Sequence, residues 1–377
     1  MEITVERSLL YSAAQKIAQY SKQQSSLEVL KLMRIDSVQE GDREGLILTC
    51  SNIGLTVSMF IPAQIRMELR SFCIDARRFA RILKATLGNE LKLTYNAWDN
   101  TLAITCDSGM LTVKCETTED FILSAMQRWD QLKPEELRPA GNLVDLAKRV
   151  AFCSSKDEAR PVLQGVNFGP DSVAATDGFR IGYVEENSTG FEGLIPASAV
   201  TAMSRLIIGE AKYHKEPGDG IYSGLYIQSD DVRLHSVLID GNFPNYKAII
   251  PHERKLTVQF SVKEMKEALR FAEVVYSLHD ANVVRCDIGD TALEITSTDD
   301  EFGKTRTEIS IDTLFDDTNG NIERPFKIAL NGRMLMDYLC HARECEVRMD
   351  IVANNRPVAF HVEGDPLKCV IMPMHLG

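Results

Sequence analysis

The sequence lacks the features by which membrane-spanning and exported proteins are recognised. No apolar run in its 377 residues approaches the roughly 20 residues needed to cross a bilayer. The N-terminus, MEITVERSLL, has glutamates where a secretory signal carries basic residues. The nine cysteines are scattered and form no CxxC pair, which is typical of reduced, mostly buried thiols. We therefore expect a cytoplasmic protein without disulfides.

Catalytic and metal-binding motifs are missing as well. The sequence has no phosphate-binding loop, dinucleotide fingerprint, GxSxG or HExxH motif, and its seven histidines stand apart from one another. Asp177 in ATDGFRI is explained more simply by an Asp-Gly turn between strands than by catalysis. A cysteine hydrolase using Cys153 and a distant histidine stays open, because spacing does not decide it, but nothing favours it. We expect no catalytic residue, no metal and no cofactor.

A three-fold internal repeat is the strongest positive signal. A strand-like segment that leads into an amphipathic helix occurs as EITVERSLLYSAAQKIAQY, as ELRPAGNLVDLAKRVAF and as KLTVQFSVKEMKEALRFAEV. In the third copy, Met265, Leu269 and Ala272 recur at helical spacing. The repeat predicts the same strand-and-helix unit three times along the chain.

Each copy also contains a second helix. FCIDARRFARILKATL, GLIPASAVTAMSRLI and KIALNGRMLMDYLCHA each begin with a short apolar strand. Asp75, Ser198 and Asn331 follow these strands, and their residue types cap helix N-termini. Alternating segments such as LKLTYNA and LEITST predict half-buried strands between the helices. We therefore predict an α+β protein of three similar domains, at residues 1–130, 131–254 and 255–377.

Charge is distributed unevenly along the chain. The net charge is −12, from 42 basic and 54 acidic residues, which by itself argues against a nucleic-acid binder. However, the helix after Asp75 carries Arg77, Arg78, Arg81 and Lys84. Such a helix has two interpretations: a solvated face with intrahelical charge pairs, or part of a surface that faces phosphates. No aromatic interleaving or base-reading motif is present, so any nucleic-acid contact should ignore sequence.

The chain ends in an apolar segment, VIMPMHLG. Chain ends are usually frayed and polar, so this end requires an explanation. It is either the last strand of the core or part of an exposed apolar binding surface.

Four segments carry a resemblance to a known family. RPVLQGVNF, ATDGFRI, LIDGNFPNYKAIIP and the terminal VIMPMHL resemble hallmark segments of the bacterial replicative sliding clamp, the beta subunit of DNA polymerase III. They occur in the family's order, and together with the repeat the resemblance covers essentially the whole chain. It implies three DNA-clamp domains, each with two helices packed on antiparallel sheets, and a head-to-tail homodimer that closes into a ring.

The resemblance implies a non-catalytic processivity factor. The ring would encircle double-stranded DNA without sequence specificity and tether the replicative polymerase, the clamp loader and other proteins with a clamp-binding motif. No membrane partner is implied. The expected DNA-facing residues of the lumen are Lys16, Arg77, Arg78, Arg81, Lys84, Lys148, Arg149, Arg205, Lys266, Arg270 and Arg333.

The resemblance also implies a hydrophobic groove that binds partner peptides. The expected groove residues are Leu163, Thr176, Gly178, Phe179, Arg180, Ile181, Pro244, Ile249, Pro357, Val370, Ile371, Met372, Pro373, Met374 and Leu376. The family usually has His at Phe179 and Arg at His375. An alternative is therefore a paralogue specialised for repair, phage replication or resistance to a clamp-binding inhibitor.

A dimer seam is the last expectation from the resemblance. The family pairs an edge strand of its first domain with its third domain. The matching segments here are MLTVKCE, with Leu111 and Val113, and EVVYSL, with Val275 and Tyr276.

Overall fold

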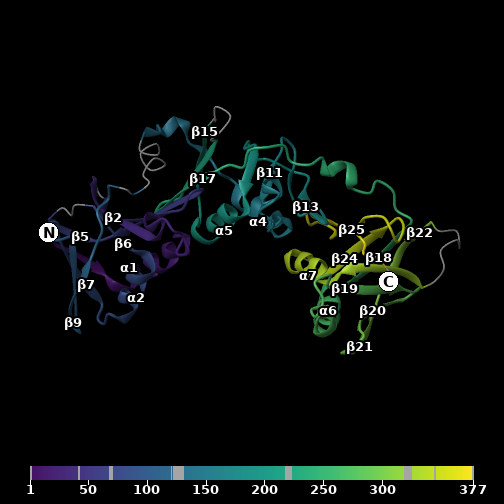
Figure 1. The fold of residues 1–377 in the computed structure, drawn as a ribbon. Coiled ribbons are helices and arrows are strands. Elements are labelled where there is room, and N and C mark those ends of the chain that lie inside the picture. Colours follow the sequence, from purple (N-terminus) through teal and green to yellow (C-terminus); the bar gives the residue numbers. More distant parts are fainter. Residues whose placement is uncertain are drawn as a thin grey trace. The chain divides into compact units, whose positions relative to one another are not determined.

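The computed structural model describes residues 2–40, 43–67, 71–119, 121, 131–216, 223–317, 325–343 and 345–375. The chain divides into two compact units (Figure 1). Unit 1 contains Met1–Gly141 and Thr201–Leu238, and unit 2 contains Asn142–Val200 and Ile239–Gly377. The predicted central domain, 131–254, thus contributes segments to both units, and the predicted boundary at residue 130 lies outside the described residues.

Unit 1 is built on two antiparallel sheets. The first has five strands in the order β5-β1-β7-β8-β9, and the second has eight in the order β10-β15-β16-β17-β4-β3-β2-β6. Pairing of β17 with β4 joins a strand of the predicted central domain to a strand of the predicted first domain. The strands are β1 (Glu2–Glu6), β2 (Leu32–Glu40), β3 (Arg43–Ser51), β4 (Leu55–Pro62), β5 (Gln64–Met67), β6 (Phe72–Asp75), β7 (Glu90–Asn96), β8 (Thr101–Cys106), β9 (Gly109–Lys114), β10 (Arg138–Pro139), β15 (Lys212–Glu216), β16 (Gly224–Gln228) and β17 (Val232–Val237).

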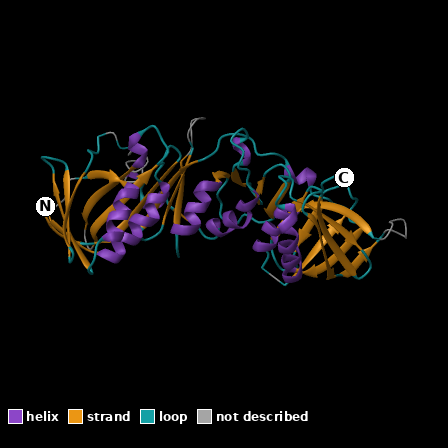
Figure 2. Cartoon of the chain, turned by 60° about the horizontal axis from the view of Figure 1, so that its bottom comes forward, coloured by secondary structure: helices purple, strands orange, loops and turns teal. Residues whose placement is uncertain are grey.

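Two helices of unit 1 pack against each other beside these sheets (Figure 2). Helix α2 (Ala76–Ala85) begins after Asp75, whose carboxylate accepts a hydrogen bond from the Arg78 amide at 2.7 Å. Its buried residues Phe79 and Leu83 lie one turn apart and face the core, which leaves its arginines outside. The helical segments are α1 (Arg7–Ile17), α2 and the short 3₁₀ turns η1 (Ala18–Tyr20), η2 (Glu28–Lys31) and η3 (Pro134–Glu136).

Unit 2 also contains two antiparallel sheets. One has nine strands in the order β14-β11-β12-β13-β26-β25-β24-β18-β22, and the other has four in the order β21-β20-β19-β23. Pairing of β13 with β26 brings the last strand of the chain next to a strand of the predicted central domain. The strands are β11 (Gly165–Phe168), β12 (Val173–Thr176), β13 (Arg180–Val184), β14 (Gly193–Pro196), β18 (Leu256–Ser261), β19 (Val283–Ile288), β20 (Ala292–Asp299), β21 (Gly303–Ser310), β22 (Asp312–Asp316), β23 (Phe326–Asn331), β24 (Glu346–Ile351), β25 (Val358–His361) and β26 (Leu367–Ile371).

The helices of unit 2 begin largely where the sequence predicts. Asn331 caps α7, because its side chain accepts a hydrogen bond from the Met334 amide at 2.9 Å. Ser198 does not precede a helix as predicted: α5 starts at Ala197, so Ser198 lies within its first turn. The helical segments are α4 (Leu143–Val150), α6 (Val262–Tyr276), α7 (Gly332–His341), η4 (Ala151–Cys153), η5 (Pro161–Leu163) and η6 (Tyr246–Ile249), while α5 (Ala197–Leu206) runs from unit 2 into unit 1.

The α+β prediction is confirmed by this mixture of helices and antiparallel sheets. All nine cysteines are free, and six of them are buried. Burial raises the pKa of the Cys73, Cys115 and Cys286 thiols to about 12, so these thiols are unreactive core residues. Among the described residues, no helix combines the length and apolar character that a membrane span requires.

Candidate functional site

The apolar chain end has two parts with different roles. Val370 and Ile371 are buried in β26 between β13 and β25, so this part is a core strand. Beyond Ile371 the chain leaves the sheet, and two backbone hydrogen bonds hold it. The Met372 amide donates to the Phe179 carbonyl and the Met374 amide donates to the Ala329 carbonyl, both at 2.8 Å. The core-strand interpretation therefore holds for Val370 and Ile371, and a binding surface stays a prediction for the residues that follow.

The turn that receives Met372 joins β12 to β13. Its ATDG sequence serves structure, because the Asp177 carboxylate accepts hydrogen bonds from the amides of Phe179 at 2.9 Å and Arg180 at 3.0 Å. Thr176 Oγ1 donates to the Arg180 carbonyl at 2.6 Å and accepts from the Gly178 amide at 3.1 Å. Gly178 has φ +93°, a conformation that favours glycine. The turn is thus tightly fixed and presents Phe179, whose side chain is 56% exposed.

The predicted groove residues fall into exposed and buried groups. Tyr246 packs with Ile181 and Val370 in one apolar cluster, which places the η6 segment beside β13 and β26. The exposed members are Gly178, Phe179, Pro244, Ile249 and Met372, and the partly exposed ones are Pro357, Pro373 and Met374. The buried members are Leu163, Thr176, Arg180, Ile181, Val370 and Ile371. Leu376 lies outside the described residues.

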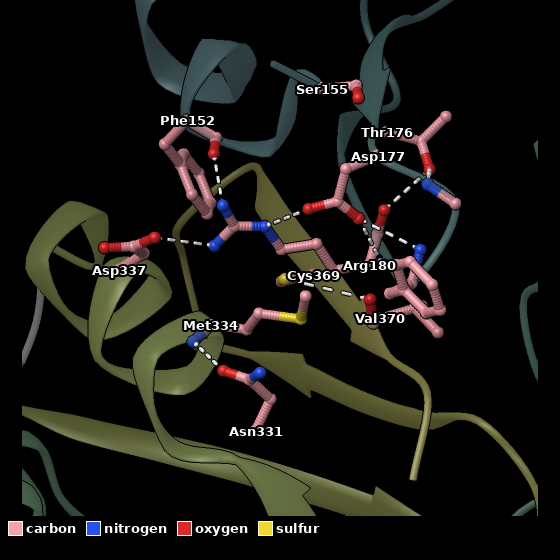
Figure 3. Close-up of polar contacts among 12 residues, drawn as sticks. Phe152, Ser155, Thr176, Asp177, Arg180, Asn331, Met334, Asp337, Cys369 and Val370 are labelled. Carbon is pink, nitrogen blue, oxygen red and sulfur yellow. Dashed lines mark hydrogen bonds and ion pairs between the residues drawn. The ribbon is translucent and has the colours of Figure 1, made fainter. Parts of the chain in front are cut away.

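Arg180 is buried and its guanidinium has three oxygen partners from three segments (Figure 3). Nε donates to Asp177 Oδ2 at 3.0 Å, Nη1 to Asp337 Oδ2 at 2.8 Å and Nη2 to the Phe152 carbonyl at 2.7 Å. Burial disfavours the charged form, but nearby negative groups, including Asp337 and Asp177, outweigh it and raise the pKa of Arg180 above its usual value. The guanidinium therefore stays charged and acts as a structural link.

Sequence reasoning missed the partners of Arg180. Phe152 stacks on His341, with ring centroids 4.3 Å apart, and also lies under the Arg180 guanidinium. Asp337 and His341 are one helical turn apart on α7, a spacing that indicates a shared face. That spacing is visible in the sequence, but it does not reveal a partner 157 residues away.

A second candidate surface is the cationic face of α2 in unit 1, which we define as Arg77, Arg78, Arg81 and Lys84. All four side chains are exposed, and within the described part of the chain none forms an ion pair. Three of them line a hollow of about 800 Å³ together with Gln15 and Gln19, and the acidic residues Glu28 and Asp75 line it as well. Two further predicted lumen residues lie in the same unit: Lys16 is exposed on α1, and Arg205 donates to Gln19 Oε1 at 3.2 Å.

The predicted lumen residues of unit 2 differ in exposure. Lys148, Arg270 and Arg333 are exposed, and Lys266 is half-buried. Arg149 is the exception, because it is 9% exposed and its guanidinium is paired with the buried carboxylate of Asp365. The structure therefore contradicts Arg149 as a DNA contact.

The predicted seam residues differ in their exposure to solvent. Strand β9 is an edge of its sheet, with Leu111 44% exposed and Val113 half-buried. Val275 and Tyr276 are 5% and 2% exposed, so they belong to the core beneath α6 and are wrong as contact residues. The exposed apolar residues at this end of α6 are instead Phe271, Val274 and Leu278.

Two sequence models of one family match the chain in tandem. The DNA polymerase III beta subunit central domain matches residues 139–245, and the C-terminal domain of the same subunit matches residues 247–375. The chain belongs to the DNA polymerase III beta subunit family. This confirms the resemblance, and the family is one of non-catalytic processivity subunits of DNA replication, the beta sliding clamps.

Full-length relatives support the same assignment. The beta sliding clamp of Staphylococcus aureus strain Mu50 is 22% identical over 384 residues, covering 97% of this chain and 96% of the relative. The beta sliding clamp of Staphylococcus epidermidis strain RP62A is also 22% identical, over the same shares of both chains.

Solved beta subunits share the fold over the whole chain. The Streptococcus pyogenes structure has a TM-score of 0.84 at 17% identity, and the Thermotoga maritima structure has 0.81 at 19%; each comparison covers 100% of both chains. A Pseudomonas aeruginosa clamp solved with bound griselimycin has a TM-score of 0.83 at 19% identity, again over 100% of both chains. The clamp fold is therefore established for this chain.

Proposed function

We propose that this chain is a DNA polymerase processivity factor that works as a head-to-tail homodimeric ring around duplex DNA. Each copy would contribute domains 1–130, 131–254 and 255–377, with the basic helix residues directed at the phosphates. The ring would tether the replicative polymerase, the clamp loader and other proteins that carry a clamp-binding motif. A cytoplasmic location remains part of this proposal.

The observation that carries the DNA part is the cationic face of α2. Four exposed basic side chains gather on one helix of a chain whose net charge is −12. Ion pairing within the described residues does not neutralise them, which argues against the interpretation as a face with internal charge pairs. Unpaired cations attract a phosphate backbone without reading bases, whereas the acidic remainder discourages binding elsewhere.

The tethering part is supported by the exposed apolar residues around the chain end. Phe179, Ile249 and Met372 are 56%, 46% and 37% exposed. The Phe179 carbonyl accepts the Met372 amide, and Ile249 lies in η6, which packs through Tyr246 against β13 and β26. Apolar side chains exposed on a fixed backbone fit a peptide-binding surface. Methionines such as Met372 and Met374 can adapt to several related peptides.

Retention on DNA of different topology tests the proposal. A ring loaded onto nicked circular plasmid should stay bound through gel filtration in high salt and should dissociate when one restriction cut linearises the plasmid. Equal retention on circular and linear DNA, or no retention on either, would contradict encirclement.

A peptide assay tests the tether. A fluorescein-labelled peptide carrying the clamp-binding motif of a bacterial replicative polymerase should bind the full chain, and deletion of Met374 to Gly377 should abolish that binding. Unchanged affinity after the deletion would exclude the chain end from the peptide site.

A second candidate is a specialised clamp paralogue. It is favoured by Phe179, which occupies an exposed position on the fixed turn where the family usually has His. Complementation of a conditional loss of the replicative clamp in the source organism separates the two: a main clamp restores growth and a paralogue does not.

A further inference from the structure

The contacts around the chain end link three segments in a closed circuit: the chain end itself, the β12–β13 turn, and the segment formed by β23 and α7. Met372 is hydrogen-bonded to Phe179 on the β12–β13 turn, and Met374 is hydrogen-bonded to Ala329 in β23. The chain end therefore bridges a strand near residue 329 and a turn near residue 179, which are far apart in the sequence.

The circuit closes through α7. Strand β23 ends at Asn331, which caps α7, and Asp337 follows six residues later on α7. Asp337 then pairs with Arg180, the residue that directly follows Phe179. Figure 3 shows this side of the circuit, with Arg180 reaching from the turn to Asp337 on α7.

We propose that Asp337 is a positioning residue for the peptide site, acting through Arg180 on the turn that presents Phe179. This inference rests on the proposed tethering function. Asp337 is not itself part of the proposed peptide-binding surface, which consists of the exposed apolar residues around the chain end. It would act by fixing the distance between α7 and the turn. This distance sets the relative positions of Phe179 and Ala329, whose carbonyls hold Met372 and Met374.

Asp337 differs from the other partners of Arg180. Asp177 lies on the same turn as Arg180, so that pair stiffens the turn without anchoring it elsewhere. Phe152 lies in η4, and its ring contacts α7 by stacking on His341, an uncharged contact. Asp337 supplies the charged contact to α7, and its geometry at 2.8 Å is that of a strong, charge-assisted hydrogen bond.

Because Arg180 is buried, its charged guanidinium depends strongly on its hydrogen-bond partners. The Arg180 side chain is 10% exposed, whereas that of Asp337 is 44% exposed. Replacing Asp337 by Asn therefore buries no new charge, keeps the shape and removes only the ionic part of the link. The fold should survive this substitution, but the positions of Phe179 and Ala329 relative to each other should be less well fixed.

The test compares Asp337→Asn with two matched variants. Glu185→Gln removes a different ion pair of unit 2, Glu185 with Lys368, which is more exposed and links the residue after β13 to β26, away from the turn. Asp337→Glu keeps the charge. With the labelled clamp-binding peptide, Asp337→Asn should weaken binding by about 3- to 10-fold, whereas Glu185→Gln stays at the wild-type value. Asp337→Glu should recover most of the affinity.

A measurement without peptide separates positioning from general stability. Hydrogen exchange of the Met372 and Met374 amides should accelerate in Asp337→Asn, while the amides of β25 and β26 and the melting temperature change no more than in Glu185→Gln. Wild-type affinity in Asp337→Asn, or a weakening that only follows the melting temperature, would overturn the inference and leave the proposed function intact. If the wild-type chain itself fails to bind the peptide, the proposed tether fails and the inference fails with it.

Discussion

Arg149 on α4 and Asp365, 216 residues later in the chain, form a buried ion pair within unit 2. The side chains are 10% and 2% exposed. Asp365 also accepts hydrogen bonds from the amides of Leu367 at 2.9 Å and Arg343 at 3.2 Å. The Arg149 Nε and Nη1 groups are buried without a partner in the described residues, so the guanidinium depends on Asp365.

Removing Asp365 should therefore destabilise unit 2 strongly. Asp365→Ala leaves a buried, uncompensated guanidinium, which typically costs about 3–5 kcal/mol. Urea unfolding followed by far-ultraviolet circular dichroism should show an earlier transition. The exposed pair Lys247 with Asp171 provides the control, since Asp171→Asn should leave the midpoint nearly unchanged. Equal midpoints for the two variants would contradict the structural role of the buried pair.

The cationic face of α2 makes a prediction about DNA. Arg78→Glu with Arg81→Glu should weaken binding to a short duplex and reduce the slope of log affinity against log salt by about 0.9 for each phosphate that the variant no longer neutralises. Fluorescence anisotropy at several salt concentrations measures both quantities. The helix should still form, because its cap uses the backbone amide of residue 78.

A charge-matched control separates local contact from net charge. Arg138→Glu with Lys212→Glu makes the same change in charge on exposed positions of β10 and β15. If this variant changes the salt slope as much as the α2 variant, the DNA contact is not localised on α2.

The sequence predicts the repeating elements well because local signals specify them. Asp75 and Asn331 cap helices as their residue types indicate, and the strands follow the alternating segments. Ser198 is the exception: the preceding strand ends at Pro196 and the helix starts at once at Ala197. Helix boundaries of this kind depend on how strand and helix pack, which a cap residue alone does not determine.

The site is predicted less completely, for two physical reasons. The buried face of α6 follows from its own spacing: Met265, Leu269 and Ala272 are buried, and continuing the period places Tyr276 in the core. That signal could have excluded Tyr276 from the seam. The partners of Arg149 and Arg180 are different, because Asp365 and Asp337 are distant in sequence and no local pattern connects them.

The surfaces around Leu111 and Val274 give a third prediction, which concerns the proposed dimer seam. Leu111 on edge strand β9 is 44% exposed and Val274 on α6 is 70% exposed, so either can take a charge without disturbing the core. If these surfaces close the proposed ring, Leu111→Asp with Val274→Asp should convert a dimer of twice 42.2 kDa into folded monomers in sedimentation velocity. Tyr276→Asp should instead unfold the protein, because Tyr276 is 2% exposed. A persistent dimer with both surface charges present would exclude this seam.

His235 gives a prediction about the dependence of stability on pH. It lies in β17 opposite Tyr226 of β16, with ring centroids 4.5 Å apart, and burial lowers its pKa from 6.5 to about 4. Between these values the unfolded chain binds a proton at His235 that the folded chain does not bind. Stability therefore decreases as the pH falls from 6.5 towards 4, with a slope of up to about 1.4 kcal/mol per pH unit from this residue.

His235→Phe removes this proton linkage while it keeps an aromatic ring against Tyr226. The variant should be similar to the wild type in urea unfolding at pH 7.5 and should lose less stability than the wild type between pH 6.5 and 5. Since the difference between the two proteins isolates one residue, other titrating groups cancel from it. A parallel decrease of stability in both proteins over this interval would show that His235 is not buried in its neutral form.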